Sequence, residues 1–173
     1  MAPSSAGQHE ALQCLLAERD CRAVLARYGI AIDWQDRPAL ESVFWPDAEV
    51  DYGFFKGGAT AFVDVLLDIA RLSLRRFHMT GNEEILVEGA AARAQSCIVT
   101  QAVSPDGDGA LRSNIYMGRF VDDLESRDDQ WRIRRRIYLQ HGAYASSYHE
   151  SATLNHMIVA DGLSTQHALW RRS

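Results

Sequence analysis

The hydrophobic pattern of this chain changes once, near Phe77, and this change constrains the fold more than any other feature. Before Phe77, apolar residues recur at helical spacing; after it, four segments show the composition and alternation of strands. These expected strands span residues 82–87, 91–102, 111–124 and 131–138, and turn-rich segments of hairpin length separate them. Consecutive long strands with short loops predict an antiparallel meander.

The part before Phe77 predicts three helices and one strand. Residues 9–31 have the spacing of an amphipathic helix, and Asp36-Arg37-Pro38 provides a capping acid and a first-turn proline for a short second one. Residues 48–55 alternate as a strand, and a third helix follows Gly57-Gly58. Helices that precede a sheet are typical of the α+β class. We therefore predict helices packed on one face of an antiparallel sheet, which strongly bent long strands would close into a cone.

Length and composition favour one compact domain. The chain has 173 residues, of which 47% are hydrophobic and 24% charged. We expect a disordered start over 1–8, one domain over 9–140, and an extension over 141–173 that serves as a lid or a subunit contact. The net charge of −5 argues against nucleic acid as a partner. We find no targeting segment and no membrane span, and predict a cytoplasmic protein.

The segment from Tyr28 to Asp33 contains the first candidate for chemistry. Asp33 follows an apolar helix between Ile32 and Trp34, where partial desolvation would suit a carboxyl group to proton transfer. The structural alternative is that Asp33 is a turn or cap residue. Tyr28 can equally be a core residue whose hydroxyl needs a partner.

His78 is the second candidate, because it lies between Phe77 and Met79 where the third helix leads into the sheet. An imidazole can take a proton near neutral pH, although a histidine in this position can also be a satisfied core residue. If Asp33 accepts a hydrogen bond from one ring nitrogen of His78, the other nitrogen is left as a general base.

The last expected strand carries an arginine run that contributes the third candidate. Strict alternation places Arg132, Arg134 and Arg136 on one face and Ile133 and Arg135 on the other. An inward arginine could stabilise an enolate or a departing anion, whereas an outward one would form solvated ion pairs. The histidines lack the spacing of a metal site, so we predict no bound metal.

In this order, the three candidates resemble the SnoaL-like branch of the NTF2-like superfamily, in particular the group with scytalone dehydratase, bile-acid 7α-dehydratase and hexachlorocyclohexane dehydrochlorinase. The resemblance covers about residues 9–140 and rests on Tyr-x4-Asp, "LESVFWPDAEVDY", "FHMTGNEEI" and "GRFVDDLESRDDQWRIRRR". It implies a cone-shaped α+β barrel of the cystatin-like type with an apolar pocket, chemistry without a cofactor, and a homo-oligomer, with a trimer favoured.

The resemblance also implies roles for individual residues. His78 corresponds to the base that removes a proton from carbon, and Asp33 to the aspartate that holds it. Asn82 corresponds to an asparagine of the histidine motif that acts as a structural hydrogen-bonder, and Arg136 to an arginine that assists a leaving halide. No histidine occurs in residues 94–100, where scytalone dehydratase has a second one, which argues against scytalone as the substrate. The substrate-binding candidates are Tyr28, Trp45, Tyr52, Phe54, Asn82, Tyr116 and Arg136.

From the candidate residues and the resemblance together, we predict a cofactor-free lyase of the elimination type that acts on a hydrophobic cyclic or aromatic small molecule. Three alternatives stay open at this stage. One is a double-bond isomerase for a cyclic ketone, which would share the proton abstraction. The others are a noncatalytic small subunit of an aromatic-ring dioxygenase and a ligand-binding protein, since this fold serves several functions.

Overall fold

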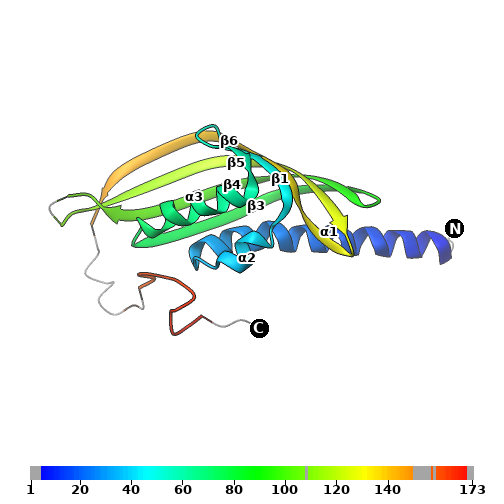
Figure 1. Ribbon diagram of the computed structural model, residues 1–173, viewed down its shortest axis with the longest axis horizontal. Coiled ribbons are helices and arrows are strands. Elements are labelled where there is room, and N and C mark those ends of the chain that lie inside the picture. The colour runs from blue at the N-terminus through cyan, green and yellow to red at the C-terminus, as the bar shows by residue number, and fades with distance from the viewer. Residues whose placement is uncertain (1–4, 108, 150–156, 158, 171–173) are drawn as a thin grey trace.

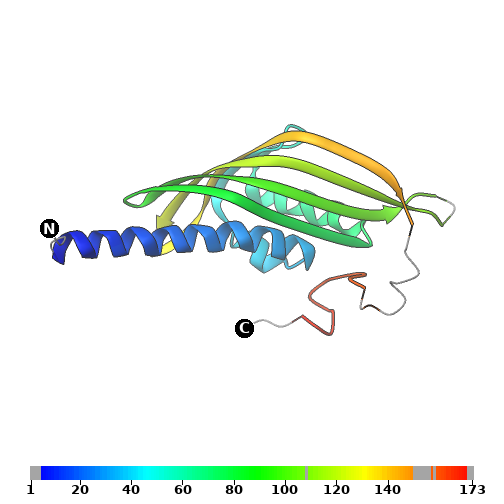
Figure 2. The same cartoon turned by 180° about the vertical axis from the view of Figure 1, so that it is seen from behind.

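The computed structural model describes residues 5–107, 109–149, 157 and 159–170. Its helices are α1 (Ser5–Asp33), α2 (Arg37–Glu41) and α3 (Ala59–Arg71). Its strands are β1 (Phe44–Asp51), β2 (Lys56–Gly58), β3 (Arg75–Glu88), β4 (Ala91–Pro105), β5 (Leu111–Arg127) and β6 (Gln130–Tyr148). Figures 1 and 2 show the three helices on the same side of a long, curved sheet. The α+β class and the packing of helices on one face are confirmed.

The sheet has the strand order β2-β1-β6-β5-β4-β3 and is mixed rather than purely antiparallel. β3 to β6 form the predicted meander, but β1 pairs with β6 in the parallel direction. β2 and β3 are the edge strands, so within the described residues the sheet does not close into the expected barrel. Instead, α1 packs against β3 and α3 against β1. The helices lie on the concave side of the curved sheet (Figures 1 and 2).

Several strands extend beyond the predicted limits. β3 begins at Arg75 instead of residue 82, so His78 lies within a strand. β6 continues to Tyr148, where it pairs with Leu111, and therefore crosses the boundary expected between residues 140 and 141. Residues 140–147, Gln-His-Gly-Ala-Tyr-Ala-Ser-Ser, have low intrinsic strand preference, and it is the ladder with β5 that holds them extended.

The N-terminal helix is longer than expected and only partly buried. α1 begins at Ser5, inside the segment that we expected to be disordered; residues 1–4 lie outside the described residues. Its first turns reach past the end of the sheet (Figure 1), and Leu12 and Leu15 are exposed although they belong to its apolar stripe. Buried contacts begin at Cys21 and continue to Ile32, so the second half of the helix carries the packing.

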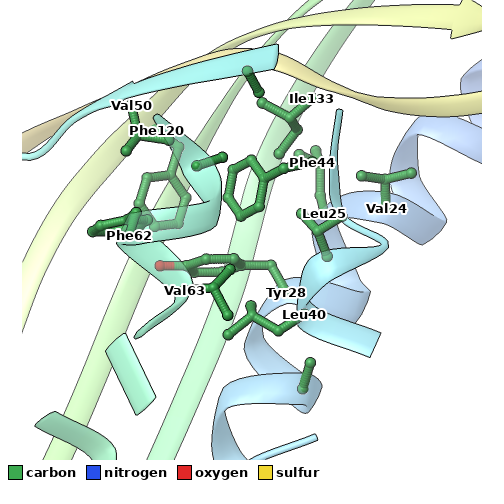
Figure 3. Packing of buried hydrophobic residues seen from close by; sticks show 14 of the residues in the cluster. Val24, Leu25, Tyr28, Leu40, Phe44, Val50, Phe62, Val63, Phe120 and Ile133 are labelled. Carbon is green, nitrogen blue, oxygen red and sulfur yellow. The ribbon is translucent and has the colours of Figure 1, made fainter. Parts of the chain in front are cut away.

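The core lies between the helices and the concave face of the sheet. Tyr28 lies among Leu25, Phe44, Phe62 and Phe120, side chains from α1, β1, α3 and β5 (Figure 3). Tyr28 meets the rings of Phe44 and Phe120 edge to face, with centroids 6.2 and 5.4 Å apart. Because this cluster draws on α1, α3, β1 and β5, it holds the two helices on the sheet. None of the described helices is long and apolar enough to cross a bilayer.

Candidate active site

A cavity of about 340 Å³ opens beside this core, between α1, α3 and β3 to β6. Its apolar wall includes Ile32, Leu66, Ile69, Ile98 and Phe120. The lining residues that carry polar groups come from all sides of the cavity: Tyr28, Tyr52, Ser73, Arg76, His78, Thr100, Gln101, Tyr116, Tyr138 and Gln140. A pocket of this size whose exposed surface is mostly apolar is typical of a small-molecule site.

His78 and Asp33 form a hydrogen-bonded pair at this cavity, although 45 positions separate them in the chain. Asp33 Oδ1 lies 2.7 Å from His78 Nδ1, and Asp33 Oδ2 accepts from the backbone N–H of His78 at 3.1 Å. The Asp33 side chain is 16% exposed and the His78 side chain is 12% exposed. An ionised carboxylate only accepts, so Nδ1 carries the proton of this hydrogen bond and Nε2 keeps a lone pair. Nε2 has no hydrogen-bond partner among the described residues, and the imidazole forms part of the cavity wall.

Two tyrosines face the same cavity and share a hydrogen bond. The hydroxyl oxygens of Tyr28 and Tyr52 are 2.7 Å apart, and the ring of Tyr28 meets the His78 ring edge to face at 6.5 Å. Burial raises the pKa of Tyr28 and that of Tyr52, so both hydroxyls stay protonated at neutral pH. One hydroxyl proton can remain between the two oxygens while the other is donated to an oxygen of a bound molecule.

The remaining cavity candidates are the aromatic residues Phe54 and Tyr116, which the structure places in the wall. The ring of Phe54 lies 6.1 Å from that of Tyr52, and Tyr52 stacks on Tyr138 at 5.3 Å. Four of the seven substrate-binding candidates, Tyr28, Tyr52, Phe54 and Tyr116, therefore share the cavity with His78.

Arg136 lies behind the cavity rather than in its wall. Its side chain is 1% exposed and forms two hydrogen bonds, of 2.7 and 2.8 Å, with the fully buried carboxylate of Asp122. The guanidinium also lies over the rings of Phe120 and Tyr28, at 3.9 and 4.4 Å. Burial opposes the charge, but the Asp122 carboxylate outweighs it and raises the pKa of Arg136. Arg136 thus supports the Tyr28 ring from behind.

The arginine run of β6 does not follow the strict alternation we expected. Ile133 and Arg136 are both buried, whereas Arg134 is exposed enough to pair with Asp47 at 3.5 Å. The pairing of β5 with β6 shifts between Asp123 and Leu124, and this irregularity reverses the alternation within β6. A bulge of this kind leaves no signal in a single sequence.

Trp45 and Asn82 are also placed away from the cavity. The Trp45 indole donates to the carbonyl of Glu125 at 3.1 Å and stacks with the guanidinium groups of Arg127 and Arg132. Asn82 is exposed, has a φ of 48°, and lies in an irregularity of β3 between Gly81 and Glu84. Asparagine tolerates this left-handed backbone better than most residues, which gives a structural reason for its presence.

The position of Asn82 makes two substitutions informative. Asn82→Gly is expected to keep both the stability and the enzymatic activity of the wild type, because glycine adopts positive φ freely. Asn82→Val is expected to cost about 1–2 kcal/mol, because a β-branched residue is strained there. Urea denaturation of both variants measures the difference. Loss of activity in a fully stable Asn82→Gly variant would instead indicate a direct contact with substrate.

Gly29 is a site residue that sequence reasoning missed. A Cβ at Gly29 would lie 3.1 Å from the Cβ of His78, so α1 approaches β3 closely at the histidine itself. Gly29→Ala is expected to lower kcat about tenfold by displacing the imidazole, since small misplacements of catalytic groups are costly. The helix propensity of alanine offsets the strain, so stability should change by less than about 1 kcal/mol.

The matched control for Gly29 lies on the same strand as His78. Gly81→Ala adds the same methyl group where no atom lies within 4 Å, and it should leave kcat unchanged. Kinetics of both variants, with unfolding curves, separate displacement of His78 from a general loss of fold. Equal activity of Gly29→Ala and the wild type would contradict the close approach as a constraint on the site.

Metal-ligating side chains are dispersed over the part of the chain that the structure describes. No three histidine, cysteine, aspartate or glutamate side chains gather there as ligands. His156 lies outside the described residues. The Asp33–His78 pair therefore has no third acidic or thiol partner among the residues described.

Comparison with solved structures supports the fold. A candidate scytalone dehydratase from Novosphingobium aromaticivorans is 22% identical, with a TM-score of 0.66, over 79% of this chain and 91% of that one. Hexachlorocyclohexane dehydrochlorinase LinA-type3 from Novosphingobium barchaimii is 16% identical, with a TM-score of 0.69, over 82% and 96%. An NTF2-like protein with a cystatin-like fold from Novosphingobium aromaticivorans is 21% identical, with a TM-score of 0.65, over 90% and 97%.

The sequence itself places the chain in a family. None of the curated proteins is significantly similar to it. The profile of the SnoaL-like domain, however, matches residues 13–137, which include α1 from Gln13, both partners of the Asp33–His78 pair and most of the sheet. This match spans well over half of the chain, and the NTF2-like neighbours agree with it. The chain therefore belongs to the SnoaL-like domain family.

Proposed function

We propose that the protein is a cofactor-free lyase that eliminates water, or a comparable leaving group, from a hydrophobic cyclic ketone. The observation that carries the proposal is the hydrogen bond between Asp33 and His78 Nδ1 at the wall of an apolar cavity, which leaves Nε2 as a base. Similarity in fold to a dehydrochlorinase and to a candidate dehydratase, both elimination enzymes by name, supports the reaction class.

The proposed reaction begins with removal of a proton from the carbon next to a carbonyl group. His78 Nε2 takes this proton, and the electron pair of the C–H bond moves to form an enolate. Asp33 stabilises the imidazolium that results, and a hydroxyl of the Tyr28–Tyr52 pair donates to the enolate oxygen. The enolate then collapses and expels the β-hydroxyl group. This group takes the proton from His78 and leaves as water, so the base is restored.

The cavity sets the size and polarity of the substrate. A volume of about 340 Å³ is at the small end of ligand pockets and suits a compound of one or two rings. Ile98 and Phe120 form apolar surface for the rings, and Gln101 and Gln140 can bind a further oxygen. We infer an uncharged or weakly polar bicyclic β-hydroxy ketone as the substrate class.

A defined probe tests this reaction. 3-Hydroxy-1-tetralone loses water across C2 and C3 to give naphthalen-1(4H)-one, which tautomerises to 1-naphthol by moving a C4 proton to the oxygen. The fluorescence of 1-naphthol therefore reports elimination. The proposal expects enzyme-dependent 1-naphthol formation that Asp33→Asn slows by about 100-fold or more and His78→Gln by about 1,000-fold or more. Conversion of 3-cyclohexen-1-one to its conjugated isomer, without elimination from the hydroxy ketone, would favour the isomerase alternative. Binding of both compounds without turnover would favour a ligand-binding protein.

We also propose that the protein is a homo-oligomer, with a trimer as the favoured form. Because Arg76 and His78 face the cavity, alternation points Phe77 and Met79 to the outer face of the sheet, where they are 51% and 53% exposed. The register continues this apolar surface from Met79 to Val99 on β4 and Met117 on β5. Light scattering after size exclusion should show a trimer, and Met79→Glu should shift it to a monomer.

A further inference from the structure

Arg76 joins three separate parts of the chain beside the catalytic pair. It lies on β3, two residues before His78, and is 6% exposed. Its Nη1 donates to the carbonyls of Ala70 and Ser73 at 2.8 and 2.6 Å. Its Nη2 donates to the carbonyls of Asp33 and Leu163 at 3.2 and 2.6 Å. One guanidinium therefore connects the ends of α1 and α3 with residues 159–170, which we call the C-terminal segment.

Arg76 is a buried cation whose Nη1 and Nη2 are satisfied by backbone carbonyls, while its Nε has no hydrogen-bond partner among the described residues. Burial lowers the pKa of Arg76, while the nearby Asp33 opposes this effect and favours the charge. Burial of a cation is strongly unfavourable unless hydrogen bonds satisfy it, and an apolar side chain would suffice for packing alone. Carbonyls at helix C-termini carry partial negative charge, so the ends of α1 and α3 are suitable acceptors. The arrangement uses the fork of an arginine, which a lysine cannot reproduce.

The C-terminal segment is itself anchored on the residues that follow Asp33. Gln35 Nε2 donates to the same Leu163 carbonyl at 3.3 Å, and Gly162 N–H donates to the Leu74 carbonyl at 2.9 Å. The Trp34 ring lies 5.7 Å from His167 and 5.0 Å from Trp170. Asp161 adds an ion pair with Arg75. The segment thus holds the Leu163 carbonyl in place for Arg76. It also contacts Trp34 and Gln35, the two residues that follow Asp33.

We propose that Arg76 is a positioning residue for the Asp33–His78 pair, and that the Leu163 carbonyl of the C-terminal segment completes its binding site. Asp33 is fixed at three points: its two carboxylate oxygens bind His78, and its backbone carbonyl binds Arg76. Without Arg76 the end of α1 can move relative to β3, and Asp33 no longer holds the proton of His78 on Nδ1. This inference rests on the proposed function for the meaning of the pair, but the geometry can be tested without turnover.

The tautomer of His78 is the measurement that separates positioning from general stability. Long-range ¹H–¹⁵N NMR spectra of the full-length, ¹⁵N-labelled protein at pH 8 report which ring nitrogen carries the proton, and His78→Gln assigns the signal. The wild type is expected to hold His78 as the Nδ1–H tautomer. Arg76→Met is expected to shift His78 toward a mixture with the Nε2–H form, and Arg76→Lys should show a smaller shift.

Two controls match the Arg76 variant. Leu67→Ala removes a fully buried side chain of α3 outside the cavity, so it lowers stability without touching Asp33. Arg71→Met makes the same exchange at an exposed arginine of α3, which pairs with Asp68 instead of with Asp33 or the C-terminal segment. Both are expected to keep the Nδ1–H tautomer. On 3-hydroxy-1-tetralone, Arg76→Met should lower kcat about tenfold or more and change KM less than about twofold.

The outcomes distinguish the two proposals. A folded Arg76→Met variant that keeps the Nδ1–H tautomer, or a Leu67→Ala control that loses it equally, overturns the positioning role. If Arg76→Met does not fold, Arg76→Lys carries the test, and an unchanged tautomer in that variant overturns it as well. Absence of elimination by a wild type that does hold the Nδ1–H tautomer contradicts the proposed function alone.

Discussion

A His78→Gln variant is expected to lose at least about 1,000-fold in kcat for elimination from 3-hydroxy-1-tetralone. General bases contribute about 10²- to 10⁴-fold to such rates, and an amide side chain cannot accept the proton. Glutamine can still donate to Asp33 and fills a similar volume, so the fold should be retained. Steady-state fluorescence of 1-naphthol, with urea unfolding of the same samples, measures both effects.

The exposed histidine of α1 provides the control for this variant. His9→Gln makes the same chemical change far from the cavity and should keep full activity. Asp33→Asn should lose about 100-fold or more, because an amide nitrogen presented to Nδ1 favours the wrong tautomer of the imidazole. A His78→Gln variant within tenfold of the wild type would exclude His78 as the base.

The second large effect concerns stability and the buried pair behind Tyr28. Arg136→Met is expected to lower the free energy of unfolding by about 3–5 kcal/mol, because it leaves the Asp122 carboxylate buried without its cation. The double variant Arg136→Met and Asp122→Leu should recover at least half of this loss, since neither charge remains to be desolvated. Guanidinium unfolding of the single and double variants measures the coupling.

The outcome also bears on how Arg136 acts. Because its guanidinium lies over the Tyr28 ring and outside the cavity wall, the double variant should bind 1-tetralone with an affinity within about threefold of the wild type. If Arg136→Met alone lowers the free energy of unfolding by less than about 1 kcal/mol, water reaches the Asp122 carboxylate. A tenfold loss of affinity in the stable double variant would show direct contact with the ligand.

Much of the fold could be predicted because its signals are local. The change of period near Phe77, the cap at Asp36 and the turns between the long strands each act over a few residues. The parallel pairing of β1 with β6 joins Phe44 to Ile133, and no local pattern specifies such a contact. No local pattern specifies the two bulges either. One reverses the in-and-out alternation of β6 around Ile133, and the other shifts the pairing of β3 with β4 beyond Gly81.

The candidate site shows the same division between local and distant signals. Residue types near α1 and β3 were sufficient to propose Asp33 and His78, but their hydrogen bond depends on the packing of α1 across β3. Arg76 could have been found from its position two residues before His78, which is the same face of a strand. It was missed because the mixed polarity of residues 75–81 delayed the predicted start of β3.

The central claim is that His78 removes a proton from carbon, and exchange with solvent tests it without any leaving group. In D₂O, 1-tetralone can form an enolate but has no hydroxyl to eliminate. NMR should show enzyme-dependent deuterium at C2 with the wild type, and a rate at the uncatalysed level with His78→Gln. Exchange that proceeds equally in both proteins, or its absence from a wild type that binds 1-tetralone, would contradict the account.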